Sequence, residues 1–250
     1  MEHLHLSTIT AVSQISEPIN LQEIYDKLPI SEYIPFIEFG SDNPPRGFSK
    51  KMLKKTRSKK PKKKRIFYNQ ATIHVFNGHK IVNVKLFNNG KIQMTGLKKP
   101  NQGVLLINEL MKHLQSFNLL PEKIINILSY KLVCINSDFC IGFEIDREGL
   151  QNEIINSGMY SSFEPCIYPG VNIKYFINTN NTNGICCCNS MCNGKGDGLS
   201  DGNCKKITIA VFKSGNIIIT GGQNTDQLET AYYFITRFIN RQKDKFMLHK

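Results

Sequence analysis

Two stretches of alternating apolar and polar residues predict two β-hairpins in this chain. Successive side chains of a strand point to opposite faces, so each hairpin has one apolar face and one mixed face. In the first hairpin the apolar face is Val82, Val84, Leu86, Ile92 and Met94, and the other face is Asn83, Lys85, Phe87, Gln93 and Thr95. In the second, the apolar face is Ile207, Ile209, Val211, Ile217 and Ile219, and the other is Lys206, Thr208, Ala210, Phe212, Ile218 and Thr220.

A helix-like stretch follows each hairpin. Helical spacing of apolar residues is seen first at Val104, Ile107, Met111 and Leu114, and later at Leu228, Ala231, Tyr232, Ile235 and Ile239. The second stretch opens with Asn224 and Gln227, the spacing of a capping box. Helices that cover the apolar faces leave Phe87 and Phe212 on the uncovered faces. Each ring there is either an interaction element or a residue of a minor core.

The hairpins are also an internal repeat. The segment KLFNNGKIQMTG at residues 85–96 and the segment AVFKSGNIIITG at residues 210–221 share identical residues at five of twelve positions. The identical pairs are Phe87/Phe212, Gly90/Gly215, Ile92/Ile217, Thr95/Thr220 and Gly96/Gly221. Two copies at so long a spacing predict a duplicated half-domain with pseudo-twofold symmetry rather than a solenoid.

The positive charge of the chain is concentrated in one segment. The 250 residues include 32 Lys and Arg against 20 Asp and Glu, a net charge of +12. Residues 46–65 hold twelve of the basic residues and no acidic one, so the remainder is neutral overall. The run KKPKKKR at 59–65 is typical of a nuclear localisation signal or of an arm that binds DNA electrostatically, and the alternative is a solvated loop. We favour a nucleic-acid role over a solvated loop.

Hydropathy and cysteine usage indicate a soluble protein of a reducing compartment. The longest aliphatic run, residues 104–107, is far shorter than the roughly 20 apolar residues of a membrane span, and the first ten residues do not resemble a signal peptide. Eight cysteines, three of them adjacent, do not fit a secreted disulfide framework. Residues 40–65 and 178–204 lack a hydrophobic period and are predicted to be loops or insertions.

The cysteines of the second insertion raise the question of a metal site. Cys186, Cys188, Cys192 and Cys204 supply enough thiolates for tetrahedral zinc. Their spacing matches no regular zinc finger, so a disordered insertion without metal is the favoured interpretation. The histidines lack HExxH-like spacing, and neither GxSxG nor a P-loop occurs. We therefore expect no enzyme activity and no cofactor.

The repeated segments resemble the TATA-box-binding protein family. FNNGKIQMTG and FKSGNIIITG are similar to its phenylalanine, turn and Thr-Gly strand, and FEPCIYPG at 163–170 is similar to its stirrup. Residues 130–150 align without gaps with the strand and helix that open the second half of family members. The resemblance implies an α+β fold, a duplicated saddle with a curved antiparallel sheet of about ten strands and four helices on the convex face. The halves would be residues 1–120, with insertion 40–65, and residues 121–250, with insertion 178–204.

The resemblance also implies a DNA-binding surface. Family members insert two phenylalanines per half between base steps, and the matching positions here are Phe87 and Gln70, and Phe212 and Tyr168. Groove contacts on the same face would come from Thr95, Thr220, Gln93, Ile218, Lys85 and Ala210. The two central asparagines of the family are replaced by Ser7 or Thr8 and by Cys134, and phosphate contacts would come from Lys91, Lys98, Lys99 and Lys174, unless these lysines are simply solvated. We expect binding with relaxed sequence preference, because deformability would replace hydrogen-bonded readout.

The implied partners are AT-rich promoter DNA, a transcription factor IIB-like factor and RNA polymerase. We expect the protein to bind DNA as a monomer and to bind no membrane. The factor would contact the stirrup at Glu164 and Cys166. The implied location is the nucleus or the cytoplasmic transcription site of a virus. Two alternatives to a DNA-bending initiation factor are a protein-interaction module that has lost groove binding and an accessory domain of a nucleic-acid enzyme such as a DNA glycosylase.

Overall fold

The computed structural model describes residues 4–49, 67–179 and 183–248. The chain forms two compact units. Residues 9–132 make up one, here called the first-repeat unit, and residues 1–8 with 133–250 make up the other, the second-repeat unit. The expected division into sequence halves at residue 120 stays a prediction.

The first-repeat unit contains most of β1 (His5–Ile15) and the first part of β7 (Ile127–Cys140). Between them lie α1 (Leu21–Lys27), β2 (Phe36–Phe39), β3 (Arg46–Gly47), β4 (Gln70–Phe76), β5 (Ile81–Phe87), β6 (Lys91–Leu97) and α2 (Gln102–Ser116). The second-repeat unit continues with the rest of β7, then α3 (Arg147–Asn156), β8 (Tyr160–Glu164), β9 (Tyr168–Ile177), β10 (Lys205–Val211), β11 (Asn216–Gly222), α4 (Thr225–Arg241) and α5 (Lys243–Phe246).

The hydrogen-bonded strand order is β3-β2-β4-β5-β6-β1 in the first-repeat unit and β7-β11-β10-β9-β8 in the second-repeat unit. The pairs β4/β5 and β5/β6 of one unit, and β9/β10 and β10/β11 of the other, are antiparallel. The prediction of an α+β fold built on an antiparallel sheet is therefore confirmed. The described residues form eleven strands and five helices, and the additional elements include the two-residue β3 and the four-residue α5.

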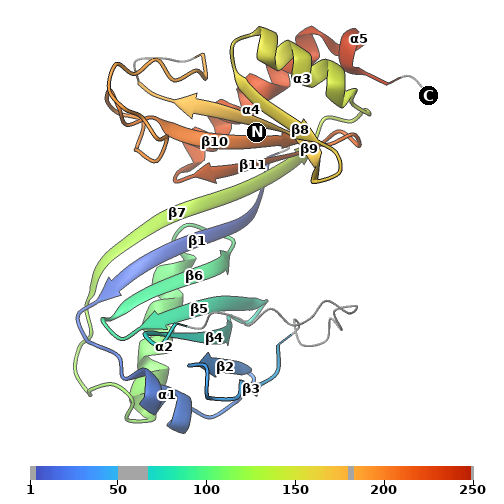
Figure 1. Cartoon of the computed structure of the whole chain (residues 1–250). Helices are drawn as coiled ribbons and strands as arrows, with labels where there is room; N and C mark the ends of the chain where they lie inside the picture. Colours follow the sequence, from blue (N-terminus) through green and yellow to red (C-terminus); the bar gives the residue numbers. More distant parts are fainter. Residues whose placement is uncertain (1–3, 50–66, 180–182, 249–250) are drawn as a thin grey trace. The chain divides into compact units, whose positions relative to one another are not determined.

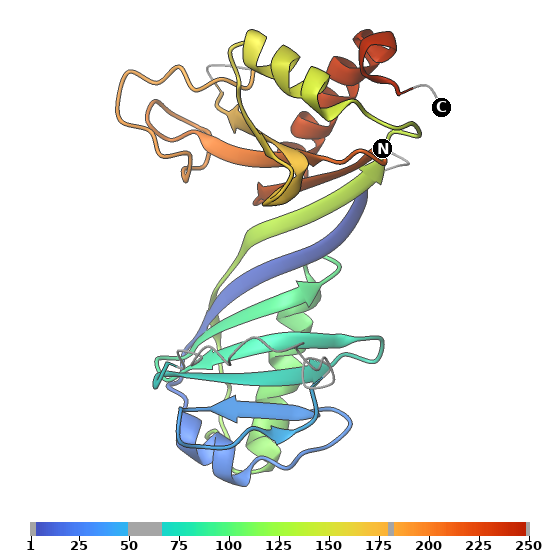
Figure 2. The same cartoon turned by 45° about the vertical axis from the view of Figure 1, so that its right-hand side comes forward.

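The apolar faces of both hairpins are covered by helices, as predicted. In the first-repeat unit α2 runs along one side of β4 to β6 (Figure 1) and buries Leu106, Ile107, Leu110, Met111 and Leu114. In the second-repeat unit α3 and α4 lie on the same side of the sheet (Figure 2), and α4 buries Leu228, Ala231, Ile235 and Ile239. Of the predicted helix residues, Val104 and Tyr232 are only half-buried. No helix in these described ranges is long and apolar enough to span a membrane.

Backbone contacts repeat between the units. The Ile15 amide donates to the Gly90 carbonyl at 3.0 Å, and the Ile141 amide donates to the Gly215 carbonyl at 2.9 Å. The next helix starts in the same way in each unit, since the side chains of Asn20 and Asp146 cap α1 and α3. These equivalent contacts show that the sequence repeat is also a structural repeat.

The repeated glycines have a steric reason. Gly90 and Gly215 both have φ of +80°, a backbone conformation that residues other than glycine rarely adopt. A Cβ atom at Gly90 would lie 2.4 Å from the Glu17 carbonyl oxygen, and one at Gly215 would lie 2.2 Å from the Phe143 carbonyl oxygen. The turns beside Phe87 and Phe212 therefore need glycine in both copies.

The first predicted insertion includes part of the sheet. Arg46 begins β3, which pairs with β2, so residues 40–65 are not entirely a loop. The Arg46 guanidinium donates to the Tyr25 carbonyl and lies 5.7 Å from the centre of the Tyr25 ring. Arg46 thus has a structural role, while the rest of the basic run, from residue 50 to residue 65, lies outside the described residues together with the predicted localisation signal.

Candidate nucleic-acid interface

The uncovered face of the first-repeat unit carries the side chains that the alternation predicted. Lys85 pairs across the sheet with Gln93, and Asn83 pairs with Thr95. All four side chains are half-buried, whereas their neighbours Val84 and Met94 are completely buried on the helix side. The predicted groove residues of this unit thus share one partly exposed face.

Of the two positions predicted to be wedges in this unit, one holds an aromatic ring and the other holds an amide. Gln70 pairs directly with Phe87 across β4 and β5. The Gln70 side-chain amide donates to the Thr72 hydroxyl at 3.4 Å, so it lies along the strand rather than over the ring. Phe67 and Tyr68, which precede β4, are 61% and 87% exposed. The register of β4 and β5 thus places Gln70, and neither Phe67 nor Tyr68, opposite Phe87.

The second-repeat unit brings two aromatic rings together on the equivalent face. The centroids of Tyr168 and Phe212 are 5.7 Å apart, and the ring planes meet at 62°. Gly170 lies against both rings, since a Cβ atom there would be 3.0 Å from the Tyr168 ring and 3.2 Å from the Phe212 ring. Edge-to-face packing of this kind is a favoured arrangement of aromatic pairs.

The part of this face beside the aromatic pair carries mostly small or β-branched residues. Thr208 pairs with Thr220, and Ala210 pairs with Ile218, as β10 runs beside β11. Asn172 of β9 pairs with Ala210 on the other side. A strip of short side chains thus lies beside the aromatic pair.

Lys174 is part of the uncovered face rather than a freely solvated lysine. Its ammonium group donates to the Asn172 side chain at 3.0 Å and to the Thr208 hydroxyl at 3.1 Å. Partial burial lowers the Lys174 pKa, and repulsion from Lys206 lowers it further. By contrast Lys91, Lys98 and Lys99 are exposed at the ends of β6.

Cys134 of β7 and Thr8 of β1 lie at equivalent positions of the two repeats, where the resemblance predicted the central groove residues. In the second-repeat unit the Cys134 thiol donates to the Asn136 side chain at 3.3 Å, and Asn136 pairs with Thr220. In the first-repeat unit Thr10 takes the equivalent pairing with Thr95, and their hydroxyls lie 3.3 Å apart. Thr8 precedes Thr10 by two residues, as Cys134 precedes Asn136.

This register selects Thr8 rather than Ser7 as the counterpart of Cys134. The Ser7 hydroxyl instead donates to the Asn136 backbone carbonyl at 3.0 Å. Sequence reasoning overlooked Thr10, Asn136 and Asn172 as polar residues of the uncovered faces, although the alternation of each strand would have identified them. It also overlooked Asp138, which pairs with Ile218 and lies 3.4 Å from the His5 imidazole.

The stirrup is a hairpin between β8 and β9. Glu164 and Tyr168 pair across it, the Ile167 amide donates to the Glu164 carbonyl at 2.9 Å, and Glu164 and Cys166 are both exposed. Arg147 at the start of α3 supports the hairpin, because its guanidinium donates to the Pro169 carbonyl at 2.6 Å and lies 4.8 Å from the centre of the Phe163 ring. Arg147 was not among the predicted residues.

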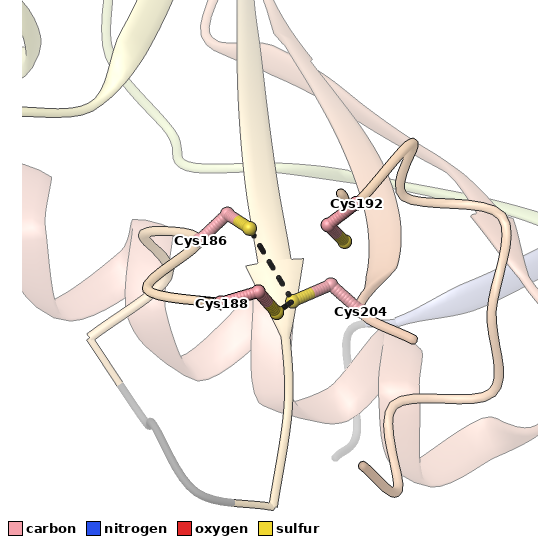
Figure 3. A group of neighbouring side chains, drawn as sticks. All are labelled: Cys186, Cys188, Cys192 and Cys204. Atoms are coloured by element: carbon pink, nitrogen blue, oxygen red, sulfur yellow. Dashed lines mark hydrogen bonds between the residues drawn. The ribbon is translucent and has the colours of Figure 1, made fainter. Parts of the chain in front are cut away.

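The second insertion has a defined conformation in its described part. Its Asn178 and Cys204 are buried, and Thr179 donates a backbone hydrogen bond to Gly198. The prediction of a disordered insertion does not fit these contacts. The four candidate metal ligands lie together, as Figure 3 shows.

Comparisons with known proteins agree with this geometry. The family model described as transcription factor TFIID (or TATA-binding protein, TBP) matches residues 129–242. A TATA-box-binding protein-like protein of Acanthamoeba polyphaga mimivirus is 32% identical over 265 aligned residues, which cover 98% of this chain and 67% of the relative. The TBP of Methanococcus jannaschii has a similar fold, with a TM-score of 0.55 and 14% identity over 96% of this chain and 99% of that one.

The family is one of DNA-binding transcription factors that are not enzymes and that act with the transcription machinery. Its repeated hairpins, its helix-covered sheet and its stirrup all have counterparts here. The alignment with the viral relative covers almost the whole chain. This chain belongs to the TATA-box-binding protein family.

Proposed function

We propose that this protein is a transcription initiation factor that binds AT-rich promoter DNA in the minor groove and bends it with aromatic wedges. The observation that carries the proposal is the Tyr168 and Phe212 pair on the uncovered face of the second-repeat unit. Apolar rings inserted between base steps unstack them and kink the duplex, as TATA-box-binding proteins themselves do. Thr208, Thr220, Ala210 and Ile218 beside the rings suit close contact with a widened groove.

The two units are not equivalent as wedges. The second-repeat unit presents two rings, whereas the first-repeat unit presents Phe87 beside Gln70. An amide is poorly suited to intercalation because its polar atoms would lose hydration between stacked bases. We infer that the kink produced by the second-repeat unit is the stronger one.

Sequence preference would be weak in this mechanism. The minor groove distinguishes AT from GC pairs but little more. Thr8 and Cys134 stand where the family has asparagine donors, and the Cys134 thiol donates within the protein, to Asn136. Selectivity would therefore depend mostly on the ease with which the duplex bends.

The test is the bend angle of an AT-rich duplex, measured by fluorescence transfer between dyes at its ends. Phe87→Ala combined with Phe212→Ala should abolish bending, and Phe212→Ala should reduce it more than Phe87→Ala does. Tyr233→Ala is the control, because Tyr233 is an exposed aromatic residue on α4 rather than on the uncovered face. An unchanged bend in a correctly folded double variant would refute the proposal.

The replaced donors and Gln70 favour one alternative, a module that contacts other proteins of the transcription machinery without binding the groove. A titration of TATA, scrambled and GC-rich duplexes at several salt concentrations separates the two functions. The protein should lack residues 50–65 but retain Arg46, which binds the Tyr25 carbonyl. Tight, salt-resistant binding to the TATA duplex excludes the alternative.

The finer partner assignments belong to the same proposal. The exposed Glu164 and Cys166 of the stirrup would contact a transcription factor IIB-like protein that recruits RNA polymerase, with one protein molecule on each site. Glu164→Arg should prevent a ternary complex in a gel-shift assay while leaving the binary DNA complex intact. The site of action would be the nucleus or a cytoplasmic viral transcription site, which imaging of the labelled protein in the host cell would distinguish.

A further inference from the structure

Four thiols from distant parts of the second insertion meet at one point. Cys186, Cys188 and Cys192 lie in the loop of the insertion, and Cys204, its last residue, directly precedes β10 (Figure 3). All four sulfur atoms lie within 4.8 Å of one another. The Cys204 sulfur is 3.4 Å from that of Cys188 and 3.7 Å from that of Cys186.

These separations fit a single tetrahedral ion. Zinc bound by four thiolates at about 2.3 Å places neighbouring sulfur atoms about 3.8 Å apart. The separations between the sulfur atoms therefore need to change by no more than about an ångström. A disulfide would require two of the sulfurs to approach to about 2.05 Å. An iron–sulfur cluster would need the cysteine sulfur atoms to lie farther apart, because its irons and inorganic sulfides lie between the thiolates.

Hydrogen bonds from the surrounding chain hold Cys204 in place within the cluster. Cys204 is 1% exposed, and its sulfur accepts a hydrogen bond of 3.5 Å from the Asn178 side-chain amide. The same Asn178 amide donates to the Ser200 carbonyl at 2.8 Å, and the Gly196 amide donates to the Cys204 carbonyl at 3.1 Å. Hydrogen bonds from surrounding groups orient the ligands of metal sites.

A carboxylate orders the loop that carries two further ligands. Asp201 accepts hydrogen bonds from the backbone amides of Asn189 and Ser190 at 2.9 and 3.0 Å. Because these residues lie between Cys188 and Cys192, Asp201 joins the ligand-bearing loop to the segment that leads to Cys204. The ligands on both sides are thereby held close together.

Large apolar side chains in the described part of the insertion are partly left in solvent. Its larger apolar side chains include Met191 and Leu199, which are 98% and 66% exposed. A short segment without a hydrophobic core commonly depends on a disulfide or a structural metal, and disulfides are rare in reducing compartments. Cys187, which separates two of the ligands in the sequence, is exposed and is not part of the group.

We propose that Cys186, Cys188, Cys192 and Cys204 form a structural zinc site that anchors the second insertion to the edge of β10. The anchored segment reaches the uncovered face of this unit, since a Cβ atom at Gly194 would lie 2.6 Å from Lys206 and 3.0 Å from the Phe176 ring. Zinc would thus also order the start of β10 at Lys206, two residues before Thr208.

The test begins with the full chain purified without chelator. Elemental analysis should find about one zinc per chain, and replacement by Co²⁺ should give the intense visible bands of a tetrahedral tetrathiolate site. The variant Cys188→Ser with Cys192→Ser should lose the metal and the cobalt bands. The matched control, Cys187→Ser with Cys166→Ser, removes the same number of thiols, both exposed and both outside the group, and should retain them.

Three results would overturn the zinc site. The first is wild-type protein that binds neither ion stoichiometrically, and the second is a cobalt spectrum typical of octahedral oxygen ligands. The third is equal metal loss in both double variants. The cobalt spectrum of the wild type tests the site even if the Cys188→Ser and Cys192→Ser protein does not fold. DNA bending is measured separately, so the result of the metal experiment neither supports nor refutes the proposed function.

Discussion

The ring of Tyr168 meets the ring of Phe212 edge to face, with centroids 5.7 Å apart, whereas the cross-strand partner of Phe87 is the amide Gln70. The two copies of the repeat therefore share a fold but differ at the positions that we propose as wedges. Aromatic pairs of this kind are coupled by about 0.5–1.5 kcal/mol beyond the area that they bury. The orientation of one ring in the second-repeat unit thus depends on the other.

Gly170→Ala should disturb this pair without unfolding the protein. A Cβ atom at residue 170 would lie 3.0 Å from the Tyr168 ring and 3.2 Å from the Phe212 ring, and Gly170 is not among the glycines with positive φ. We expect a smaller DNA bend by fluorescence transfer and a nearly unchanged thermal unfolding midpoint. Wild-type bending by Gly170→Ala would show that the packing of the two rings is not required.

Gln70→Phe should give the first-repeat unit a second proposed wedge beside Phe87. The new ring would stand opposite Phe87 in the register of β4 and β5. We expect a larger bend and up to about tenfold tighter binding, or about 1.4 kcal/mol. Thr72→Phe is the control, because Thr72 lies on the same face but opposite Lys85. Equal gains from both variants would indicate general hydrophobic binding instead.

Lys174→Gln should reduce the salt dependence of DNA binding. Gln retains hydrogen-bonding capacity toward Asn172 and Thr208, both of which accept from Lys174, but removes the charge. If Lys174 neutralises one phosphate, the slope of log K against log salt should become shallower by about 0.9. Lys112→Gln on the exposed side of α2 should leave the slope unchanged. An unaltered slope in the Lys174 variant would place this lysine outside the DNA contact.

Alanine at the two repeated turns should destabilise the protein strongly. Positive φ alone costs about 1–2 kcal/mol for a residue with a Cβ atom. Gly90→Ala and Gly215→Ala add contacts of 2.4 and 2.2 Å with carbonyl oxygens. Gly78 isolates the first effect, since its φ is +84° and nothing lies within 4 Å of its Cβ position. In urea unfolding, both turn variants should lose at least twice the stability that Gly78→Ala loses. Similar losses at all three sites would remove the steric explanation.

His113 should make the protein less stable in mild acid. Its imidazole packs against the rings of Tyr33 and Phe117, at 4.7 and 5.2 Å, and burial lowers the His113 pKa. The unfolded chain then binds a proton more readily than the folded chain, so stability is lost as pH falls through the unfolded pKa of about 6.5. His113→Leu should show a smaller decrease in the free energy of unfolding between neutral and mildly acidic pH. His79→Leu, at an exposed turn, is the control. An equal decrease in wild type and His113→Leu would assign the effect to other groups.

The amino-acid sequence by itself determined the repeated hairpins, the face that each helix covers and the uncovered positions of Phe87 and Phe212. These features depend on side-chain periods of 2 and 3.6 residues and on turns that need glycine, which act over a few residues. The resemblance of the motifs to the TATA-box-binding protein family could also be seen in the sequence, because the order of short motifs survives the divergence of the rest.

Only the tertiary structure decided which side chains meet. The partnership of Gln70 with Phe87 and of Tyr168 with Phe212, and the choice of Thr8 over Ser7, depend on strand register, which long-range packing sets. The convergence of Cys186 and Cys204 depends on the path of an irregular loop. Such a path follows from hydrogen bonds between residues far apart in the sequence, and no periodic pattern encodes it.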